Sequence, residues 1–311
     1  MRFSSSLFAL STCLSILVSL VLPFSVTAAA VASSGSTKLP PALVPKTGFL
    51  RPVQVVKGSF NFSKLSADKV LVVDANSRRI ILSKNAQVAH PLASLTKLMT
   101  AILVTEQGFA MNRVETVLPE DEVGGARLRV MNGTPLTMRD LFYAMLVGSA
   151  NNAAHALARI TGKPLPTFIT AMNTKAQTLG LTSTVFTDTS GIDVGNSSTA
   201  QDIAALALTA FDNQKIRSAA STAYYPLTID GQTRKMKNTN SLLTDPNNGL
   251  YVLGGKTGYL LESKWNFVVK MMDARKRPLL VVVLGSASQA DSAKDAATVA
   301  KWVWSHYQWK K

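Results

Sequence analysis

The two ends of the chain carry runs of apolar residues that predict β-strands. Residues 70–74 and 79–82 are rich in Val, Ile and Leu, and Ala75-Asn76-Ser77 between them is typical of a hairpin turn. Short apolar runs with turn residues around them predict later strands at residues 256–260, 266–272 and 279–284. The sequence therefore predicts strands both early and late in the chain.

The middle of the chain instead shows the spacing of helices. A capping box, Thr137-Met138-Arg139-Asp140, is expected to open one helix. Another helix is predicted from a stripe of apolar residues that ends at Gly180, namely Leu165, Phe168, Met172, Ala176 and Leu179. Strands from both ends with a helical middle favour an α+β fold, in which helices cover an antiparallel sheet and the middle forms a helical subdomain.

The N-terminal 66 residues differ from the rest. Residues 1–32 contain Arg2, an apolar run and then Ala28-Ala29-Ala30, which predicts a signal peptide and export to the periplasm or the outer face of the cytoplasmic membrane. A retained membrane anchor is the alternative. Residues 33–66 are rich in Pro and Ser and predict an extended leader that lies on the domain or tethers it. Residues 67–311 are long enough for one compact domain.

Composition excludes several kinds of chemistry. Cys13 is the only cysteine and lies in the predicted signal peptide, which excludes disulfides, thiol catalysis and a Cys-rich zinc site from the mature chain. The three histidines lack metal-binding spacing, so we expect no metal and no other cofactor. The net charge is +15 at pH 7, but no aromatic-basic motif suggests nucleic acid. Contact with membrane or wall polymers and an ordinary basic surface are equal alternatives.

The strongest candidate for catalysis is Ser94-Leu95-Thr96-Lys97. A serine three residues before a lysine at a helix start places hydroxyl and amine one turn apart, so the amine can take the hydroxyl proton. An apolar stripe at helical spacing follows, ahead of Gly108: Leu95, Leu98, Met99, Ile102 and Leu103. Ser66-Ala67-Asp68-Lys69 has the same pattern, but it runs into a predicted strand, where residues three apart point to opposite faces.

Two further motifs follow Ser94 in the sequence, Ser149-Ala150-Asn151 and Lys256-Thr257-Gly258. Each has an ordinary structural explanation when taken alone. Ser149 and Asn151 could cap a helix over residues 152–161, and Lys256 could be an exposed lysine on a strand. The order and setting of all three motifs together favour a catalytic site.

At these motifs the chain resembles the low-molecular-mass penicillin-binding proteins, the serine D-alanyl-D-alanine carboxypeptidases and endopeptidases. The resemblance rests on longer strings around each motif and runs from about residue 69 to residue 304. These strings are Ala93-Ser94-Leu95-Thr96-Lys97-Leu98-Met99-Thr100-Ala101, Met145-Leu146-Val147-Gly148-Ser149-Ala150-Asn151-Asn152-Ala153-Ala154 and Gly254-Gly255-Lys256-Thr257-Gly258-Tyr259. The resemblance implies a penicillin-binding-protein/β-lactamase-like fold. It also implies peptidoglycan stem peptides as substrates and β-lactams as covalent inhibitors.

The resemblance also implies catalytic roles for three residues. Ser94 would attack the carbonyl between two D-alanines and form an acyl-enzyme, while Lys97 would act as the base. An ordinary lysine titrates near pH 10.4, so burial and the charge of Lys256 would have to lower the pKa of Lys97. Ser149 would pass a proton to the leaving amine.

The other residues of the motifs would bind substrate. Asn151 would hold the substrate amide and orient the base, and Lys256 with Thr257 would attract the terminal carboxylate. Gly258 would leave room for substrate to lie along the strand. The backbone N–H of Tyr259, together with that of the nucleophile, would hold the oxyanion.

Two other functions stay open at this point. A serine β-lactamase shares the three motifs but needs a base to hydrolyse its acyl-enzyme, and no Glu occurs between Glu122 and Glu262. A wall-binding scaffold without turnover would also keep the pocket. The segment after the third motif, Leu260-Leu261-Glu262-Ser263-Lys264-Trp265, differs from the small polar residues common there in the family, so we expect the rim of the pocket to differ as well. The aromatic tail over residues 301–309 is expected to form a final helix on the sheet, with membrane contact as the alternative.

Overall fold

The structure is a computed structural model that describes residues 39–245 and 247–311. The predicted signal peptide lies outside the described residues. No helix in the described part of the chain is long and apolar enough to cross a membrane.

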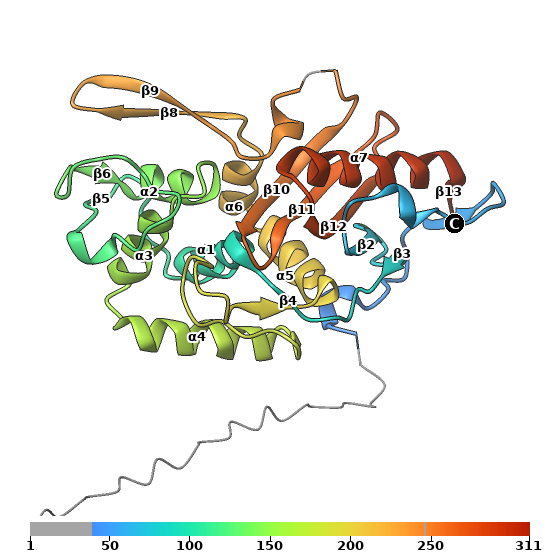
Figure 1. Cartoon of the computed structure of the whole chain (residues 1–311), viewed down its shortest axis with the longest axis horizontal. Coiled ribbons are helices and arrows are strands. Elements are labelled where there is room, and N and C mark those ends of the chain that lie inside the picture. The colour runs from blue at the N-terminus through green and yellow to red at the C-terminus, as the bar shows by residue number, and fades with distance from the viewer. Residues whose placement is uncertain (1–38, 246) are drawn as a thin grey trace, which may run out of the picture. The chain divides into compact units, whose positions relative to one another are not determined.

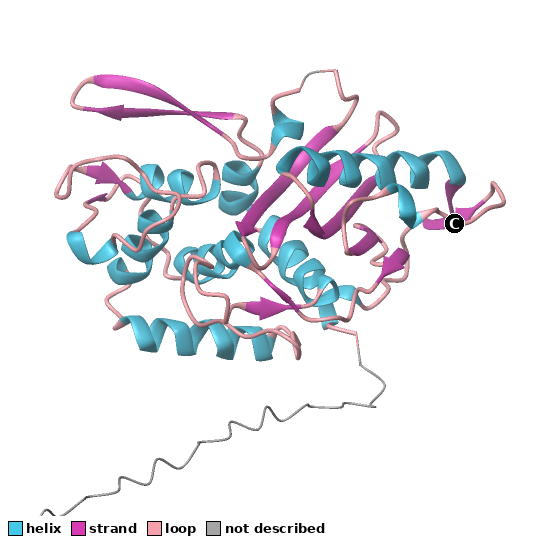
Figure 2. Ribbon diagram, in the orientation of Figure 1, coloured by secondary structure: helices cyan, strands magenta, loops and turns pink. Residues whose placement is uncertain are grey.

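A five-stranded antiparallel sheet forms the centre of the fold, as Figures 1 and 2 show. Its strands in spatial order are β10 (Tyr251–Leu260), β11 (Lys264–Met272), β12 (Pro278–Ser286), β2 (Lys69–Asp74) and β3 (Ile80–Lys84). Every residue of β12 is buried, because this central strand of Val and Leu is covered on both faces. The early strand β2 pairs directly with the late strand β12. The predicted antiparallel sheet, built from both ends of the chain, is confirmed.

Helices cover both faces of this sheet. The C-terminal helix α7 (Gln289–His306) packs on one face, where Ala296, Val299 and Val303 join a hydrophobic cluster with β11 and β12. Helix α5 (Ala200–Asp212) packs on the other face and belongs to the larger core. Thr199 caps α5 by accepting a hydrogen bond from the backbone N–H of Asp202, at 3.1 Å. The sheet therefore lies between two helical layers.

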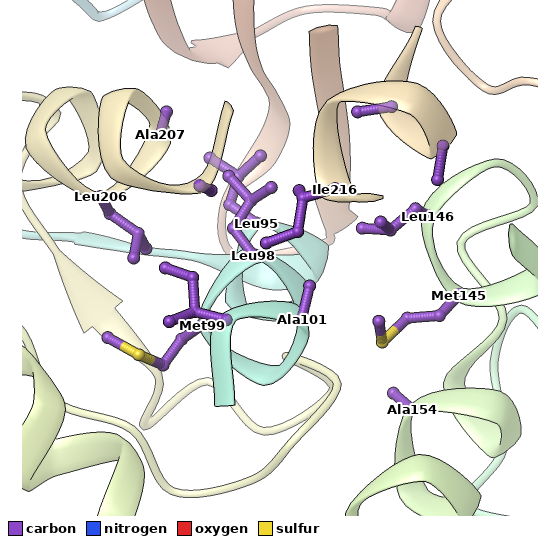
Figure 3. Close-up of a cluster of buried hydrophobic side chains, with 14 of the residues drawn as sticks. Leu95, Leu98, Met99, Ala101, Met145, Leu146, Ala154, Leu206, Ala207 and Ile216 are labelled. Carbon is purple, nitrogen blue, oxygen red and sulfur yellow. The ribbon is translucent and has the colours of Figure 1, made fainter. Parts of the chain in front are cut away.

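The predicted helical subdomain is present. It contains α1 (Lys97–Glu106), α2 (Met138–Leu146), α3 (Asn151–Ile160), α4 (Leu165–Thr178) and α6 (Gln214–Ala220). Helix α1 lies at its centre, where Leu98 and Met99 pack among side chains of α2, α5 and α6 (Figure 3). The predicted capping box at Thr137 and Asp140 is also confirmed, since each residue bonds the backbone N–H of the other.

Short elements complete the fold. The 3₁₀ turns are η1 (Pro41–Leu43), η2 (Phe62–Lys64), η3 (Ala93–Thr96), η4 (Pro119–Asp121) and η5 (Ser241–Leu243). The short strands are β1 (Arg51–Gln54), β4 (His90–Pro91), β5 (Val114–Glu115), β6 (Leu136–Thr137), β7 (Ser197–Ser198), β8 (Tyr224–Ile229), β9 (Gln232–Lys237) and β13 (Tyr307–Lys310).

The structure adds detail at both ends of the described chain. From Leu39 onward the leader packs on the domain: Leu43 is buried, and β1 pairs with β13. The predicted final helix does pack on the sheet, with Trp304 buried. However, it ends at His306, so Trp309 lies in a strand, and its indole N–H donates to Asp74 at 2.6 Å.

The hairpin formed by β8 and β9 is a feature that the sequence analysis missed. Its turn is Asp230-Gly231, and both residues have positive φ, 49° and 74°. An Asp-Gly pair is favoured in such a turn because it adopts positive φ at low cost. This dipeptide could have revealed the hairpin.

Candidate active site

The candidate nucleophile and base meet where η3 passes into α1. Ser94 lies in η3 and Lys97 is the first residue of α1, which places the amine Nζ 2.9 Å from the hydroxyl Oγ. Ala93, immediately before the serine, has φ of 49°, a conformation that non-glycine residues rarely adopt. Such strained backbone is frequent at functional sites.

Lys97 is completely buried, with 0% of its surface exposed. Burial lowers the pKa of its amine well below the ordinary value, and the positive charge of Lys256 lowers it further. The amine also contacts the side-chain oxygen of Asn151 at 2.7 Å and the backbone oxygen of Ser190 at 2.6 Å. Of its three oxygen partners, only the hydroxyl of Ser94 carries a proton that a neutral amine could accept.

The Ser190 carbonyl belongs to a loop that the sequence analysis did not identify. Asp188 organises this loop: its carboxylate accepts hydrogen bonds from the backbone N–H groups of Ser190, Gly191 and Asp193. Burial raises the pKa of Asp188, but these hydrogen bonds more than offset it and hold the pKa below its ordinary value. Asp188 therefore stays ionised and fixes the position of the carbonyl beside Lys97. The signal in the sequence is only Asp188-Thr189-Ser190-Gly191, which resembles many polar turns.

Ser149 lies in the turn between α2 and α3 and also has positive φ, 60°. The N-cap of α3 is Ala150, without a side-chain capping bond, so the structure does not support capping by Ser149 or Asn151. The amide of Asn151 instead donates to the backbone oxygen of Gly124 at 2.9 Å and turns its own oxygen toward Lys97. This turn therefore points its polar side chains into the site.

The third motif lies on β10, the edge strand of the sheet. Lys256 is only 1% exposed, so the alternative of an exposed strand lysine is wrong. Burial lowers its pKa to about 7. Its Nζ donates to the hydroxyl of Ser149 at 2.8 Å, and the hydroxyl of Thr257 donates to that of Thr239 at 2.6 Å. The second and third motifs are thus in direct contact.

Gly258 allows β10 to pass close to the segment that carries the nucleophile. A Cβ at this position would lie 3.0 Å from both the backbone N of Ser94 and the carbonyl oxygen of Leu92. Any larger residue would push the strand away from η3. The neighbouring Tyr259 is half exposed, and its ring packs against Trp265 with the centroids 4.6 Å apart.

These residues open into one cleft of about 330 Å³. Ser94, Ser149, Asn151, Thr257, Gly258 and Tyr259 line it, together with residues that include Gly148, Ile192, Thr239 and Gln289. Lys97 and Lys256 lie buried behind this surface. No Asp or Glu lines the cleft among the described residues.

The alternative Ser66 motif has a structural role. Ser66 donates its hydroxyl to Asp295 at 2.8 Å, and Lys69 begins strand β2. The histidines lie outside the cleft lining: His90 contacts Asn266, and His306 stacks on Trp302. The described residues contain no group of three or more His, Cys, Asp or Glu that could hold a metal ion.

Comparison with known proteins shows the family of this chain. A sequence profile for D-alanyl-D-alanine carboxypeptidase matches residues 56–288. The chain belongs to the D-alanyl-D-alanine carboxypeptidase family. It is a serine peptidase. The family acts on peptidoglycan peptides and binds β-lactams as penicillin-binding proteins do.

Individual relatives include both activities named in the sequence analysis. A D-alanyl-D-alanine endopeptidase from Haemophilus influenzae is 33% identical over 72% of this chain and 77% of its own length. The D-alanyl-D-alanine carboxypeptidase DacB2 from Mycobacterium tuberculosis is 28% identical over 75% of this chain and 80% of its own. The solved structure of the Streptomyces K15 DD-transpeptidase is 26% identical, covers 81% of this chain and all of its own, and has a TM-score of 0.72.

Proposed function

We propose that Ser94 is the nucleophile of this D-Ala-D-Ala peptidase and that Lys97 is its base. The buried amine of Lys97, in contact with Ser94, is the observation that carries the proposal. Two of its partners are carbonyl oxygens, so a neutral amine donates to both and turns its lone pair to the serine hydroxyl. As Ser94 Oγ bonds to the carbonyl carbon, its proton passes to Lys97 Nζ.

The oxyanion that forms in this step needs donors already in place. We assign the backbone N–H groups of Ser94 and Tyr259, because the close approach at Gly258 brings β10 beside the nucleophile. Such a donor is typically worth about 3 kcal/mol of transition-state stabilisation. Collapse of the tetrahedral intermediate then leaves an acyl-enzyme on Ser94 and expels the amine of the second D-residue.

Ser149 is suited to protonate that leaving amine. Lys256 donates to the Ser149 oxygen, so the hydroxyl proton of Ser149 can point into the cleft. The protonated Lys256 with Thr257 attracts the carboxylate beside the leaving amine, and Asn151 has a second amide N–H available for the substrate backbone. The proton taken up by Lys97 replaces the one that Ser149 has given away, so both groups return to their starting states. Water then attacks the ester carbonyl and gives its proton to Lys97, which passes it to Ser94 Oγ as the ester C–O bond breaks.

Both cleavage of the terminal D-Ala and cleavage of crosslinks are consistent with this site. Similarity to the Haemophilus influenzae endopeptidase favours crosslinks as the main substrate. The test is to incubate the protein with crosslinked dimeric muropeptide and with monomeric pentapeptide, and to separate the products by chromatography. We expect hydrolysis of the dimer. Acylation by penicillin with hydrolysis of neither peptide would instead favour the non-catalytic scaffold.

We further propose that β-lactams form a long-lived adduct rather than being turned over. The opened ring keeps its leaving nitrogen tethered near the ester, and no carboxylate in the described cleft lining could activate water. Asp193, an acidic residue of the nearby loop, does not line the cleft, and its carboxylate accepts a hydrogen bond from the backbone N–H of Gly195 at 2.8 Å. Mass spectrometry should show one added drug mass that Ser94→Ala lacks. Rapid return to the free mass with continued drug hydrolysis would make the protein a β-lactamase.

Export is the final part of the proposal. A cell-wall peptidase must meet its substrate outside the cytoplasm, and the predicted signal peptide over residues 1–32 would take it there. N-terminal sequencing of the functional protein is expected to find a start near Ser33. A start at Met1 would contradict cleavage.

A further inference from the structure

A groove that the sequence motifs do not predict lies beside the catalytic cleft. Gly148 lines the cleft on one side, and with Ala150 it also lines the groove. The walls of the groove come from residues 127–130 and from the hairpin of β8 and β9. The outer part, between this hairpin and the loop that leads to β6, has a volume of about 700 Å³. Figure 1 shows the long hairpin beside the end of the helical subdomain that holds β5 and β6.

The groove carries a strong excess of positive charge. Five exposed cationic side chains line it: Arg127, Arg129, Arg234, Lys235 and Lys237. Two carboxylates, Glu122 and Asp230, lie in its outer part. Within the described residues, the only salt bridge of any of these cations is a long one, 3.9 Å, from Arg127 to Glu122.

These cations contribute little to the fold. Lys235 lies over the ring of Tyr224, at 4.1 Å, whereas Arg129, Arg234 and Lys237 have no ion pair within the described part of the chain. Like charges in one groove repel one another and attract anions, so the arrangement is suited to an anionic ligand.

The hairpin is held in place rather than projecting freely. Met236 packs on Gly148, where a Cβ would lie only 2.8 Å from its sulfur. Tyr225 donates its hydroxyl to Asp140 at 2.7 Å and stacks on Tyr143 of α2, with the centroids 4.3 Å apart. The cations of β9 therefore have a defined position relative to Ser149.

The position of the groove indicates which part of a substrate would reach it. Gly148 and Ala150 flank Ser149, the residue assigned to the leaving amine, so the groove begins on the leaving-group side. In the carboxypeptidase reaction the leaving group is a single D-alanine, which ends at the Lys256 site. In crosslink cleavage the leaving group is an entire stem peptide, which carries further carboxylates.

We propose that this groove binds the anionic stem peptide that leaves when a crosslink is cut, and that it gives the enzyme its preference for crosslinked substrate. This inference rests on the proposed peptidase function. The bound stem peptide contributes affinity through its carboxylates and takes no part in the bond-breaking step. The groove therefore lowers KM for crosslinked peptide and leaves acylation by small substrates unchanged.

The test is the double variant Arg129→Gln/Arg234→Gln. Its matched control is Lys163→Gln/Lys301→Gln, which removes two exposed cations outside the groove lining. Kinetics are measured on crosslinked dimeric muropeptide, monomeric pentapeptide and labelled penicillin. We expect the groove variant to raise KM for the dimer about tenfold, because two charged contacts are lost, with kcat for the dimer and both other rates within about twofold of wild type. The control variant should match the wild type.

A second arm uses dimer whose stem carboxylates beyond the one at the scissile bond are amidated. Amidation should raise KM for the wild type and have little further effect on the groove variant, since both changes remove the same contacts. An unchanged KM for the dimer in the groove variant, or an equal rise for dimer and monomer, would reject the groove while leaving the peptidase function intact. If the wild type hydrolysed neither peptide, the peptidase function and the groove would both be rejected.

Discussion

The cleft and the groove beside it both use basic residues, but in opposite environments. Lys97 and Lys256 are at most 1% exposed, and burial lowers the pKa of each. Arg129, Arg234 and Lys237 are exposed to water. A buried lysine that loses its proton can act as a base, whereas an exposed cation can only attract and hold an anion. Burial therefore separates the base Lys97 from the exposed cations of the groove, whereas the buried Lys256 binds a carboxylate only while it is protonated, below its pKa of about 7.

The largest effect is expected when a buried lysine is removed. Lys97→Ala should slow acylation of Ser94 by penicillin about 1,000-fold, because no other group in the described part of the chain contacts the hydroxyl as a base. Gel fluorescence with labelled penicillin measures this rate. Lys69→Ala, in the alternative Ser66 motif, is the matched control and should acylate normally. A normal rate in Lys97→Ala would show that the base is another group.

Substitution of Lys256 tests the role of the charge on the second buried lysine. Lys256→Ala should lower kcat/KM for a peptide with a free terminal carboxylate about 100-fold, since the carboxylate loses its buried cationic partner. The same peptide with an amidated terminus provides the control and should lose much less. Equal losses on both peptides would assign Lys256 to proton transfer alone.

The pKa of Lys256 also predicts a pH dependence. With a pKa of about 7, the side chain is charged below that pH and neutral above it. Because kcat/KM reports on the free enzyme, its value for the carboxylate substrate should fall as pH rises through about 7. At low pH kcat/KM should fall as well, because Lys97 becomes protonated. A kcat/KM that stayed flat from about pH 6 to about pH 9 would contradict the charge assigned to Lys256.

The sequence predicted the cleft far better than the groove, for a physical reason. Ser94, Lys97 and Lys256 lie in local motifs. The spacing in each motif depends on one turn of helix or on one strand, so the sequence alone indicates how the side chains of that motif lie relative to one another. The Ser190 carbonyl is a backbone atom from a distant loop, and any residue type could supply it. Arg129 and Arg234 come from segments about a hundred residues apart, and each looks like ordinary surface charge in its own segment.

The sheet and helices were predictable for a similar reason. Continuous apolar runs such as β12 and stripes such as that of α4 reflect burial within a single element. A sheet built from both ends of the chain was predicted from the placement of the strands, but the pairing of β2 with β12 in particular was not. The path of the leader beyond Leu39 and the end of α7 at His306 depend on contacts between distant segments, including that of Trp309 with Asp74, which no local pattern records.

The smallest expected effect, that of salt, separates the two regions without any mutation. Raising ionic strength from about 0.1 M to about 1 M shortens the Debye length from about 10 Å to about 3 Å. The exposed cations of the groove should then be screened, and KM for crosslinked dimer should rise about threefold to fivefold. The contact between Lys97 and Ser94 is buried and lies within 3 Å, so acylation by penicillin should change little.

The double variant Arg129→Gln/Arg234→Gln is the reference, because its KM should depend less on salt. If KM for monomeric pentapeptide rose in parallel with that for the dimer, the salt effect would belong to the Lys256 site that both substrates share, and the contrast between buried and exposed cations would fail.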